Sequence, residues 1–207
     1  MPPKIKFSRE EMTAAALVIV REQGADALTA KAIAERLGTS TRPVFTCFGT
    51  MEEVRWEVRL SAESLFREYT EAGLTDRIPF LGYGKQYLRF ATEEPELFRL
   101  LFLSGNPDQD SGFVSSMQRS FLAVRSSLMQ IYDLSETEAK LFFRDLWLVV
   151  LSLATLKVTG ACPYSEEEIG GILTGFSVAV CKAIKEVPGF SDGKFDRDEV
   201  FRGLINK

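Results

Sequence analysis

Apolar residues recur every three or four positions along almost the whole chain, which is the spacing of one face of an α-helix. The sequence has no convincing two-residue alternation and no internal repeat, so strands are not expected. Helix starts are also marked, because a hydroxyl residue is followed three positions later by glutamate at Ser8, Thr50, Ser135 and Ser165. The chain is therefore predicted to be all-α.

The first fifty residues predict three short helices. The first covers about residues 9–23, and the second begins at a Thr29 cap and ends at Gly38. The third covers about residues 41–48 and is followed by a long connector helix over about residues 51–72. Two short helices joined by a tight turn behind a supporting helix form a helix-turn-helix, whose second helix can enter the major groove of DNA. A small three-helix bundle with no part in DNA binding is the alternative.

The third helix has an outward and an inward face. The outward positions carry small polar side chains and one cation: Ser40, Thr41, Arg42, Thr46 and Cys47. Val44, Phe45 and Phe48 are expected to hold the helix to its neighbours. Because proline disfavours a helical conformation at the preceding residue, residues 40–42 are expected to be an extended lead-in to Pro43.

The remaining residues predict further helices. One covers about residues 79–93, and a short one begins at Pro95. Another ends near Ile131 and has apolar residues every three or four positions. The last three cover about residues 136–160, 166–186 and 196–205. The last of these is expected to dock with Val200, Phe201 and Leu204 inward, and residues 104–112 form the most loop-like stretch.

Composition narrows the function. The 207 residues include no histidine, which excludes Ser-His-Asp and Cys-His nucleophiles and histidine-bound metals. The three cysteines form no CxxC pair, so no metal site and no cofactor are expected. The longest apolar run falls short of the ~20 residues that span a bilayer, and residues 1–4 open no signal-peptide core, which predicts a cytoplasmic protein without a membrane segment.

Charge is divided unevenly along the chain. The net charge is −4, yet residues 1–50 hold seven Lys or Arg and five acidic residues. This excess of two positive charges weakly favours a nucleic-acid-facing N-terminal end. Lys4, Lys6 and Arg9 could contact phosphates there, and a solvated basic tail is the alternative.

Residues 7–54, FSREEMTAAALVIVREQGADALTAKAIAERLGTSTRPVFTCFGTMEEV, resemble the DNA-binding domain of the TetR family of transcriptional regulators. The resemblance rests on the alanine-rich first helix, the TAKAIAERLG segment, the paired phenylalanines and the acidic start of the connector. It implies DNA contacts at Thr29, Lys31, Ser40, Thr41, Arg42, Phe45, Thr46 and Cys47. Met51 departs from the pattern, because the family often has a phosphate-contacting lysine there, and Cys47 replaces a polar residue or histidine.

The later sequence resembles the ligand-binding domains of the same family. YGKQYLRFATEEPELFRLLF, residues 83–102, is similar to a class with a Trp-His-Gly motif, of which only Trp147 is kept. The resemblance implies an effector pocket that aromatic side chains could line, although core packing is the alternative for each of them. The candidates are Phe66, Tyr69, Tyr83, Tyr87, Phe90, Phe98, Phe102, Phe121 and Trp147.

Two late helices are apolar on more than one side and correspond to the family's dimer-forming pair. Gly171, Gly175 and Ala179 would let two backbones approach closely, either across a dimer or in an internal helix contact.

The sequence therefore predicts a helix-turn-helix domain over residues 1–50 and an effector-binding and dimerisation domain over residues 51–207. The expected function is that of a homodimeric regulator, a repressor that binds a pseudo-palindromic double-stranded DNA operator and is released by a small apolar or aromatic effector. The alternative is a small-molecule-binding protein of the same fold with weak or lost operator recognition. An enzyme is the third class and is not expected, because no nucleophile–base pair or phosphate loop is present.

Overall fold

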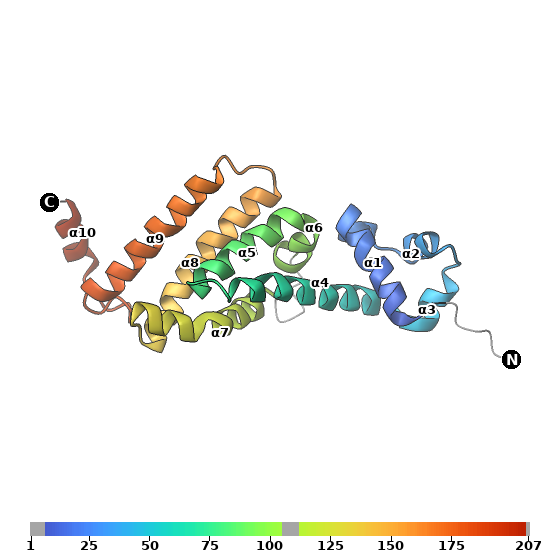
Figure 1. Ribbon diagram of the computed structural model, residues 1–207, viewed down its shortest axis with the longest axis horizontal. Coiled ribbons are helices and arrows are strands. Elements are labelled where there is room, and N and C mark those ends of the chain that lie inside the picture. The colour runs from blue at the N-terminus through green and yellow to red at the C-terminus, as the bar shows by residue number, and fades with distance from the viewer. Residues whose placement is uncertain (1–6, 105–111, 206–207) are drawn as a thin grey trace.

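The computed structural model describes residues 7–104 and 112–205, and every regular element in that part of the chain is helical, which confirms the all-α prediction (Figure 1). The helices are α1 (Arg9–Gln23), α2 (Ala30–Leu37), α3 (Arg42–Phe48), α4 (Met51–Gly73), α5 (Pro79–Glu93), α6 (Pro95–Phe98), α7 (Gly112–Tyr132), α8 (Glu136–Val158), α9 (Glu166–Glu186) and α10 (Arg197–Ile205). A 3-10 turn, Ala25–Ala27, follows α1, and a π-helical turn, Arg99–Leu103, continues α6.

Side-chain caps set the starts of several helices as the sequence predicts. The hydroxyls of Ser8, Thr50, Ser135 and Ser165 each accept a hydrogen bond from the backbone N–H three residues later. Each cap satisfies a donor that the first turn leaves without an intrahelical partner. Gly38 ends α2 with a φ of 62°, a left-handed conformation that glycine adopts without strain.

The chain forms an elongated molecule in which α4 joins two parts (Figure 1). Helices α1–α3, here called the head, lie at one end, and helices α5–α9, here called the body, lie beyond them. The first half of α4 contacts α1 and α3, and α4 also has its most extensive packing against α5. One hydrophobic core runs through all of these contacts, so α4 is rigidly connected at both of its ends.

The backbones of α4 and α5 touch where the two helices cross. A β-carbon at Gly73 would lie against the Gly82 carbonyl oxygen and 2.7 Å from the Tyr83 amide nitrogen. A β-carbon at Gly82 would lie against the Gly73 carbonyl oxygen. Only glycine fits at these two positions, and the crossing fixes the start of α5 and therefore the position of Tyr83.

A second contact ties the head to the body. The Arg21 guanidinium in α1 donates to both carboxylate oxygens of Glu94, with 2.7 Å between Nε and Oε2, and the Glu94 side chain is only 7% exposed. This pairing raises the pKa of Arg21. Arg59 of α4 donates to the carbonyl oxygens of Leu100 and Leu101 in the turn after α6. The segment around α6 is therefore held by both α1 and α4.

Two expectations about local structure are wrong. Thr41 has helical angles (φ −71°, ψ −19°), so residues 40–42 are not an extended lead-in. The Thr41 carbonyl accepts the N–H groups of Val44 and Phe45, which forms the first helical turn around Pro43. Proline has no backbone N–H, and this costs no hydrogen bond at Pro43, because an N–H in the first turn would have no intrahelical acceptor.

The C-terminal helix does not dock as expected. Phe201 and Leu204 of α10 are 62% and 70% exposed, and only Val200 is partly covered. The loop before α10 closes on itself instead, because the rings of Phe190 and Phe195 pack 5.1 Å apart. This loop directs α10 away from the body (Figure 1).

Substituting Gly73 with Ala is expected to destabilise the protein by about 2–3 kcal/mol, because neither backbone can retreat from the added methyl group. Gly84→Ala in α5, the other helix of the crossing, is the matched control, because a β-carbon there meets no atom within 4 Å. It should stabilise the protein by about 0.5–1 kcal/mol. Urea unfolding measures both changes, and equal effects of the two substitutions would contradict the proposed close crossing.

Arg21→Ala should lower the free energy of unfolding by about 1–3 kcal/mol, because it leaves the buried Glu94 carboxylate without its cation. Arg55→Ala is the control, since Arg55 pairs with Glu52 on the exposed surface of α4. Thermal unfolding of both variants makes the comparison. A Tm for Arg21→Ala that matches the control would show that the α1–α6 contact contributes nothing to stability.

Candidate functional site

The outer edge of the head exposes most of the side chains expected to contact DNA. Thr29, Lys31, Ser40, Thr41, Arg42, Phe45 and Thr46 are all exposed, and Cys47 is partly buried. Some of them also have structural roles. The Thr29 hydroxyl caps α2, the Thr46 hydroxyl donates to the Arg42 carbonyl, and the Cys47 carbonyl accepts from Arg9.

Phe45 differs from the expectation that it anchors α3. Its side chain is 47% exposed, whereas Val44 and Phe48 are buried. Val44 and Phe48 are four positions apart, so their side chains lie on the same side of this short helix and reach the core. The side chain of Phe45 points in another direction. Phe45 therefore lies on the same exposed surface as Arg42 and Thr46.

Most cations of the head are already paired with acids. Arg9 binds Glu57 of α4 at 2.7 Å, and Arg36 binds Glu22 across the α1–α2 contact at 2.8 Å. Arg21 pairs with Glu94. Arg42, in contrast, has no acidic partner within 4 Å among the described residues. Lys4 and Lys6 lie outside the described residues.

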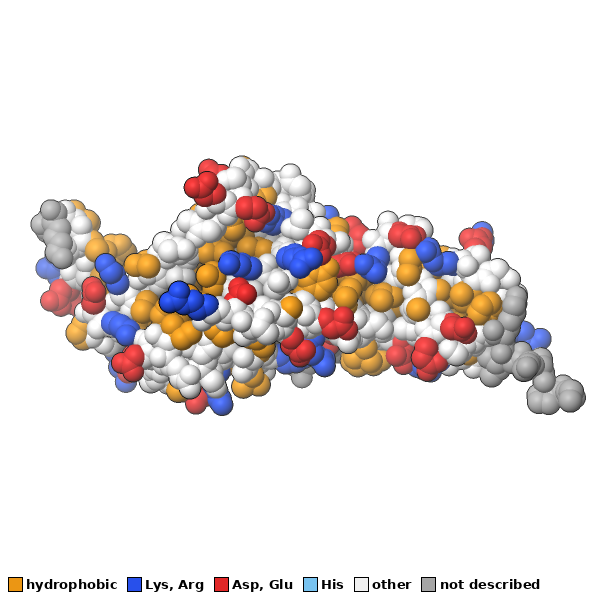
Figure 2. Space-filling model, viewed as in Figure 1, with side chains coloured by type: hydrophobic (Ala, Val, Ile, Leu, Met, Phe, Trp, Pro, Cys, Tyr) orange, Lys and Arg blue, Asp and Glu red, His pale blue; other side chains and the backbone are white. Residues whose placement is uncertain are grey.

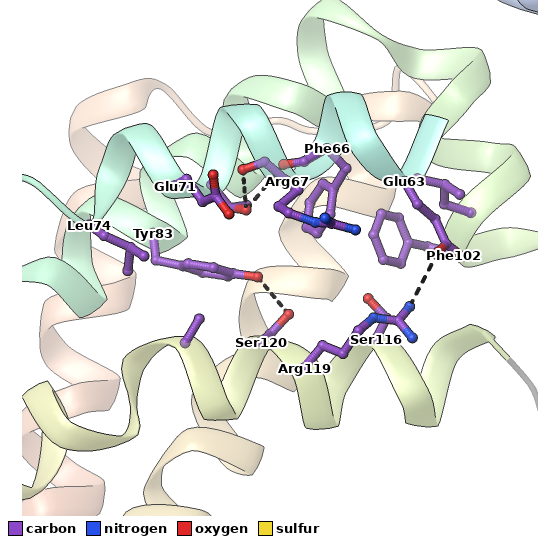
Figure 3. A pocket seen from close by; sticks show the side chains of 13 residues that line it. Glu63, Phe66, Arg67, Glu71, Leu74, Tyr83, Phe102, Ser116, Arg119 and Ser120 are labelled. Carbon is purple, nitrogen blue, oxygen red and sulfur yellow. Dashed lines mark hydrogen bonds and ion pairs between the residues drawn. The ribbon is translucent and has the colours of Figure 1, made fainter. Parts of the chain in front are cut away.

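A cavity of about 440 Å³ lies between α4, α5 and α7 (Figure 3). Its wall is aromatic on one side, where the rings of Phe66 and Phe102 meet edge to face with centroids 5.1 Å apart. Its floor is formed by buried hydroxyl groups, and its mouth by exposed charged side chains. The lining residues are Glu63, Phe66, Arg67, Thr70, Glu71, Leu74, Tyr83, Leu101, Phe102, Ser116, Arg119, Ser120 and Ala123.

The buried hydroxyls of the floor are ordered by their hydrogen bonds. Tyr83 donates to the Ser120 hydroxyl at 2.6 Å, which joins α5 to α7, and Thr70 donates to the Phe66 carbonyl. Burial raises the pKa of Tyr83, and the hydrogen bond from its hydroxyl to Ser120 opposes this rise. Tyr83 therefore stays a neutral donor at physiological pH.

A second, much smaller cavity lies on the other side of Tyr83. It has a volume of about 40 Å³ between α5, α8 and α9, and Tyr87 and Trp147 are among its lining residues. Burial raises the pKa of Tyr87 well above the usual value, and its hydroxyl has no hydrogen-bond partner among the described residues. Tyr83 lines both cavities and separates them.

The nine aromatic candidates are divided among three environments. Phe66, Tyr83 and Phe102 line the larger cavity, and Tyr83 also lines the smaller one with Tyr87 and Trp147. Phe90, Phe98 and Phe121 are buried in the core and line neither cavity. Tyr69 also lines neither: its hydroxyl donates to Glu93 at 2.7 Å, and partial burial together with that carboxylate raises the pKa of Tyr69 to about 12.

The sequence reasoning missed the polar residues of the larger cavity. Ser116 and Ser120 lie one helical turn apart on the buried stripe of α7, and Thr70 interrupts the buried stripe of α4. Hydroxyl residues on an otherwise apolar stripe were the available signal, because buried polar groups require a partner or a ligand. No comparable signal marks Arg67 or Arg119, because an arginine on the exposed side of a helix is common and does not by itself indicate a cavity.

A surface groove between α5 and α9 is larger, at about 590 Å³, but it lacks a buried polar floor. Figure 2 shows it as a hollow with apolar side chains inside and basic side chains along its edge. Its basic edge includes the exposed Lys85 and Arg89. The cavity under α4 is the better-formed site.

One face of α8 and α9 is apolar and is not covered by the rest of residues 7–104 and 112–205. Leu148 and Phe176 are 45% and 39% exposed there, and both line the same surface groove. Gly171, Gly175 and Ala179 are exposed on α9, and a β-carbon at either glycine would meet no atom within 4 Å. No contact between the described residues therefore requires small side chains at the two glycines, which removes the internal helix contact as their explanation.

No helix among residues 7–104 and 112–205 is both long enough and apolar enough to cross a membrane. In the same residues, no three His, Cys, Asp or Glu side chains are placed so that together they could hold a metal ion.

Comparison with known proteins identifies the body. A family model for the tetracycline repressor-like C-terminal domain matches residues 80–170, which extend from the start of α5 into α9. No curated protein matches the chain. The match does not confirm the Trp-His-Gly class and does not extend to the head. Residues 80–170 are therefore similar to the C-terminal domain of tetracycline repressor-like proteins.

Proposed function

We propose that the protein is a DNA-binding transcriptional regulator that responds to a small molecule and acts as a homodimer, most simply as a repressor. The observation that carries the proposal is the position of α4. This helix supplies Glu63, Phe66, Arg67, Thr70 and Glu71 to the cavity wall, and it packs against α1 and α3 of the head. Ligand binding in the cavity and the position of the head are therefore mechanically connected.

In this proposal α3 reads DNA. Its exposed edge has short hydroxyl side chains, one free guanidinium and one aromatic ring, which allow a close approach to phosphates and base edges. Met51 is partly buried and leaves no cation at the start of α4. Arg42 therefore has the largest electrostatic role among the described residues of this edge.

The uncovered face of α8 and α9 is the proposed dimer interface. Leu148 and Phe176 would be covered by the partner, and the small residues of α9 allow two helices to approach closely. A two-fold dimer would present two copies of α3 to successive major grooves about 34–36 Å apart.

In the proposed regulation, effector binding and DNA binding are coupled because each favours a different shape of the dimer. An effector releases DNA only if it binds more tightly to a dimer shape in which the two heads no longer match the groove spacing. The segment around α6 offers a physical connection, because Phe102 lines the cavity and Glu94 holds Arg21 of the head.

A second candidate function is a small-molecule-binding protein of the same fold that has lost operator recognition. The pairing of Arg9, Arg21 and Arg36 with acids favours it, since these cations are not free for phosphates. Retained ligand binding without any preference for a DNA sequence would support this candidate.

Arg42→Ala should weaken binding to the protein's own upstream DNA by about tenfold and reduce the salt slope of log K by about one, since one phosphate contact is lost. Fluorescence anisotropy at several salt concentrations measures both quantities. Arg77→Ala is the control, because Arg77 is exposed between α4 and α5, far along the chain from the head. Wild-type binding that is no tighter than binding to random duplex would contradict the regulator proposal.

Ala179→Arg should convert the dimer to a monomer, because it places an unpaired charge in the centre of the proposed interface. Sedimentation velocity measures the change in mass. Ala72→Arg introduces the same charge on the exposed side of α4 and should leave the dimer intact. If both variants sediment as dimers, the α8–α9 face is not the interface.

A further inference from the structure

We propose that the cavity between α4, α5 and α7 binds a flat ring bearing one carboxylate or equivalent anionic group, and that Arg67 is the anion-binding residue. This inference depends on the proposed function only in treating the cavity as the effector site. It adds an anionic group to the expected small apolar or aromatic effector.

The charges around the cavity favour an anion. Glu63 is already neutralised, because its two oxygens lie 3.5 Å from Arg59 and 3.7 Å from Arg119. Arg67, in contrast, has no acidic partner within 4 Å among the described residues. It reaches from α4 into the space between α4 and α7 (Figure 3). A ligand anion would supply the partner that the protein does not.

A cation fits the same charges poorly. It would meet Arg67 and Arg119 at the mouth, and it could pair with Glu63 only by displacing Arg59 or Arg119 from that carboxylate. Glu71, an exposed side chain at the rim, is the one remaining acidic group of the lining. Because exposed charges are screened by water and salt, Glu71 gives little preference for a cation.

The shape and the polarity of the cavity favour a ring next to the anion. Phe66 and Phe102 form an aromatic wall to which a flat ring can bind edge to face or by offset stacking. The volume of about 440 Å³ lies within the range of small-ligand sites. Tyr83 donates to Ser120, so the Tyr83 oxygen can still accept and the Ser120 hydroxyl can still donate a hydrogen bond to a ring substituent.

The proposal is tested with three probes of one shape: 2-naphthoate, 2-naphthalenemethanol and 2-naphthylmethylammonium. Isothermal titration calorimetry of the full chain without DNA should show the carboxylate binding about tenfold or more tighter than the alcohol, and the ammonium binding weakest. Arg67→Gln should remove the preference for the carboxylate over the alcohol. Arg67→Lys keeps the charge but loses the planar fork, so it should retain part of the preference.

Arg77→Gln is the matched control, because Arg77 is also exposed, lies just after α4 and does not line the cavity. It should bind all three probes as the wild type does. Equal affinity for the three probes, tighter binding of the ammonium, no binding of any probe, or a preference that survives Arg67→Gln would each overturn the inference. Since the measurement contains no DNA, a carboxylate preference in a protein that does not bind DNA specifically would refute the regulator proposal and leave this inference standing.

Discussion

One stripe of α4 is buried from Val54 to Gly73, and the rest of the molecule is arranged around it. Its N-terminal part packs against the head, and its C-terminal part is fixed to α5 by the contact between Gly73 and Gly82. A packed helix of this length moves as a rigid unit, because close-packed cores resist small deformations. A displacement at the cavity end of α4 must therefore be transmitted to the head or be absorbed by breaking one of these two contacts.

The segment around α6 is the second mechanical connection. Glu94 precedes α6 and binds Arg21 of α1, and Phe102 follows it and forms the aromatic wall of the cavity. Arg59 of α4 is bonded to two carbonyl groups of the same segment. The irregular π-helical turn at this point concentrates contacts from the head, the connector and the cavity in a few residues.

The sequence predicts the helices well, because caps and apolar spacing are local properties that depend on neighbouring residues. The cap at Ser135 and the glycine at the end of α2 are examples. Long-range packing is harder to predict from the sequence. The apolar residues of α10 have the spacing of a docked helix, yet the loop before α10 directs Phe201 into solvent. The charged residues of the cavity are also hidden in the sequence, since whether Arg67 lines the cavity depends on which side of α4 faces α7.

The ion pairs of the head explain why its positive charge is a poor guide to DNA affinity. Arg9 joins α1 to α4, Arg21 joins α1 to the α6 segment, and Arg36 joins α2 to α1. Each of these cations holds two elements together, so a phosphate could recruit it only by breaking a structural contact. Arg42 makes no such contact among the described residues, and its charge is therefore available without cost to the fold. In the proposed function, Arg42 would therefore contact a phosphate without breaking any of these three ion pairs.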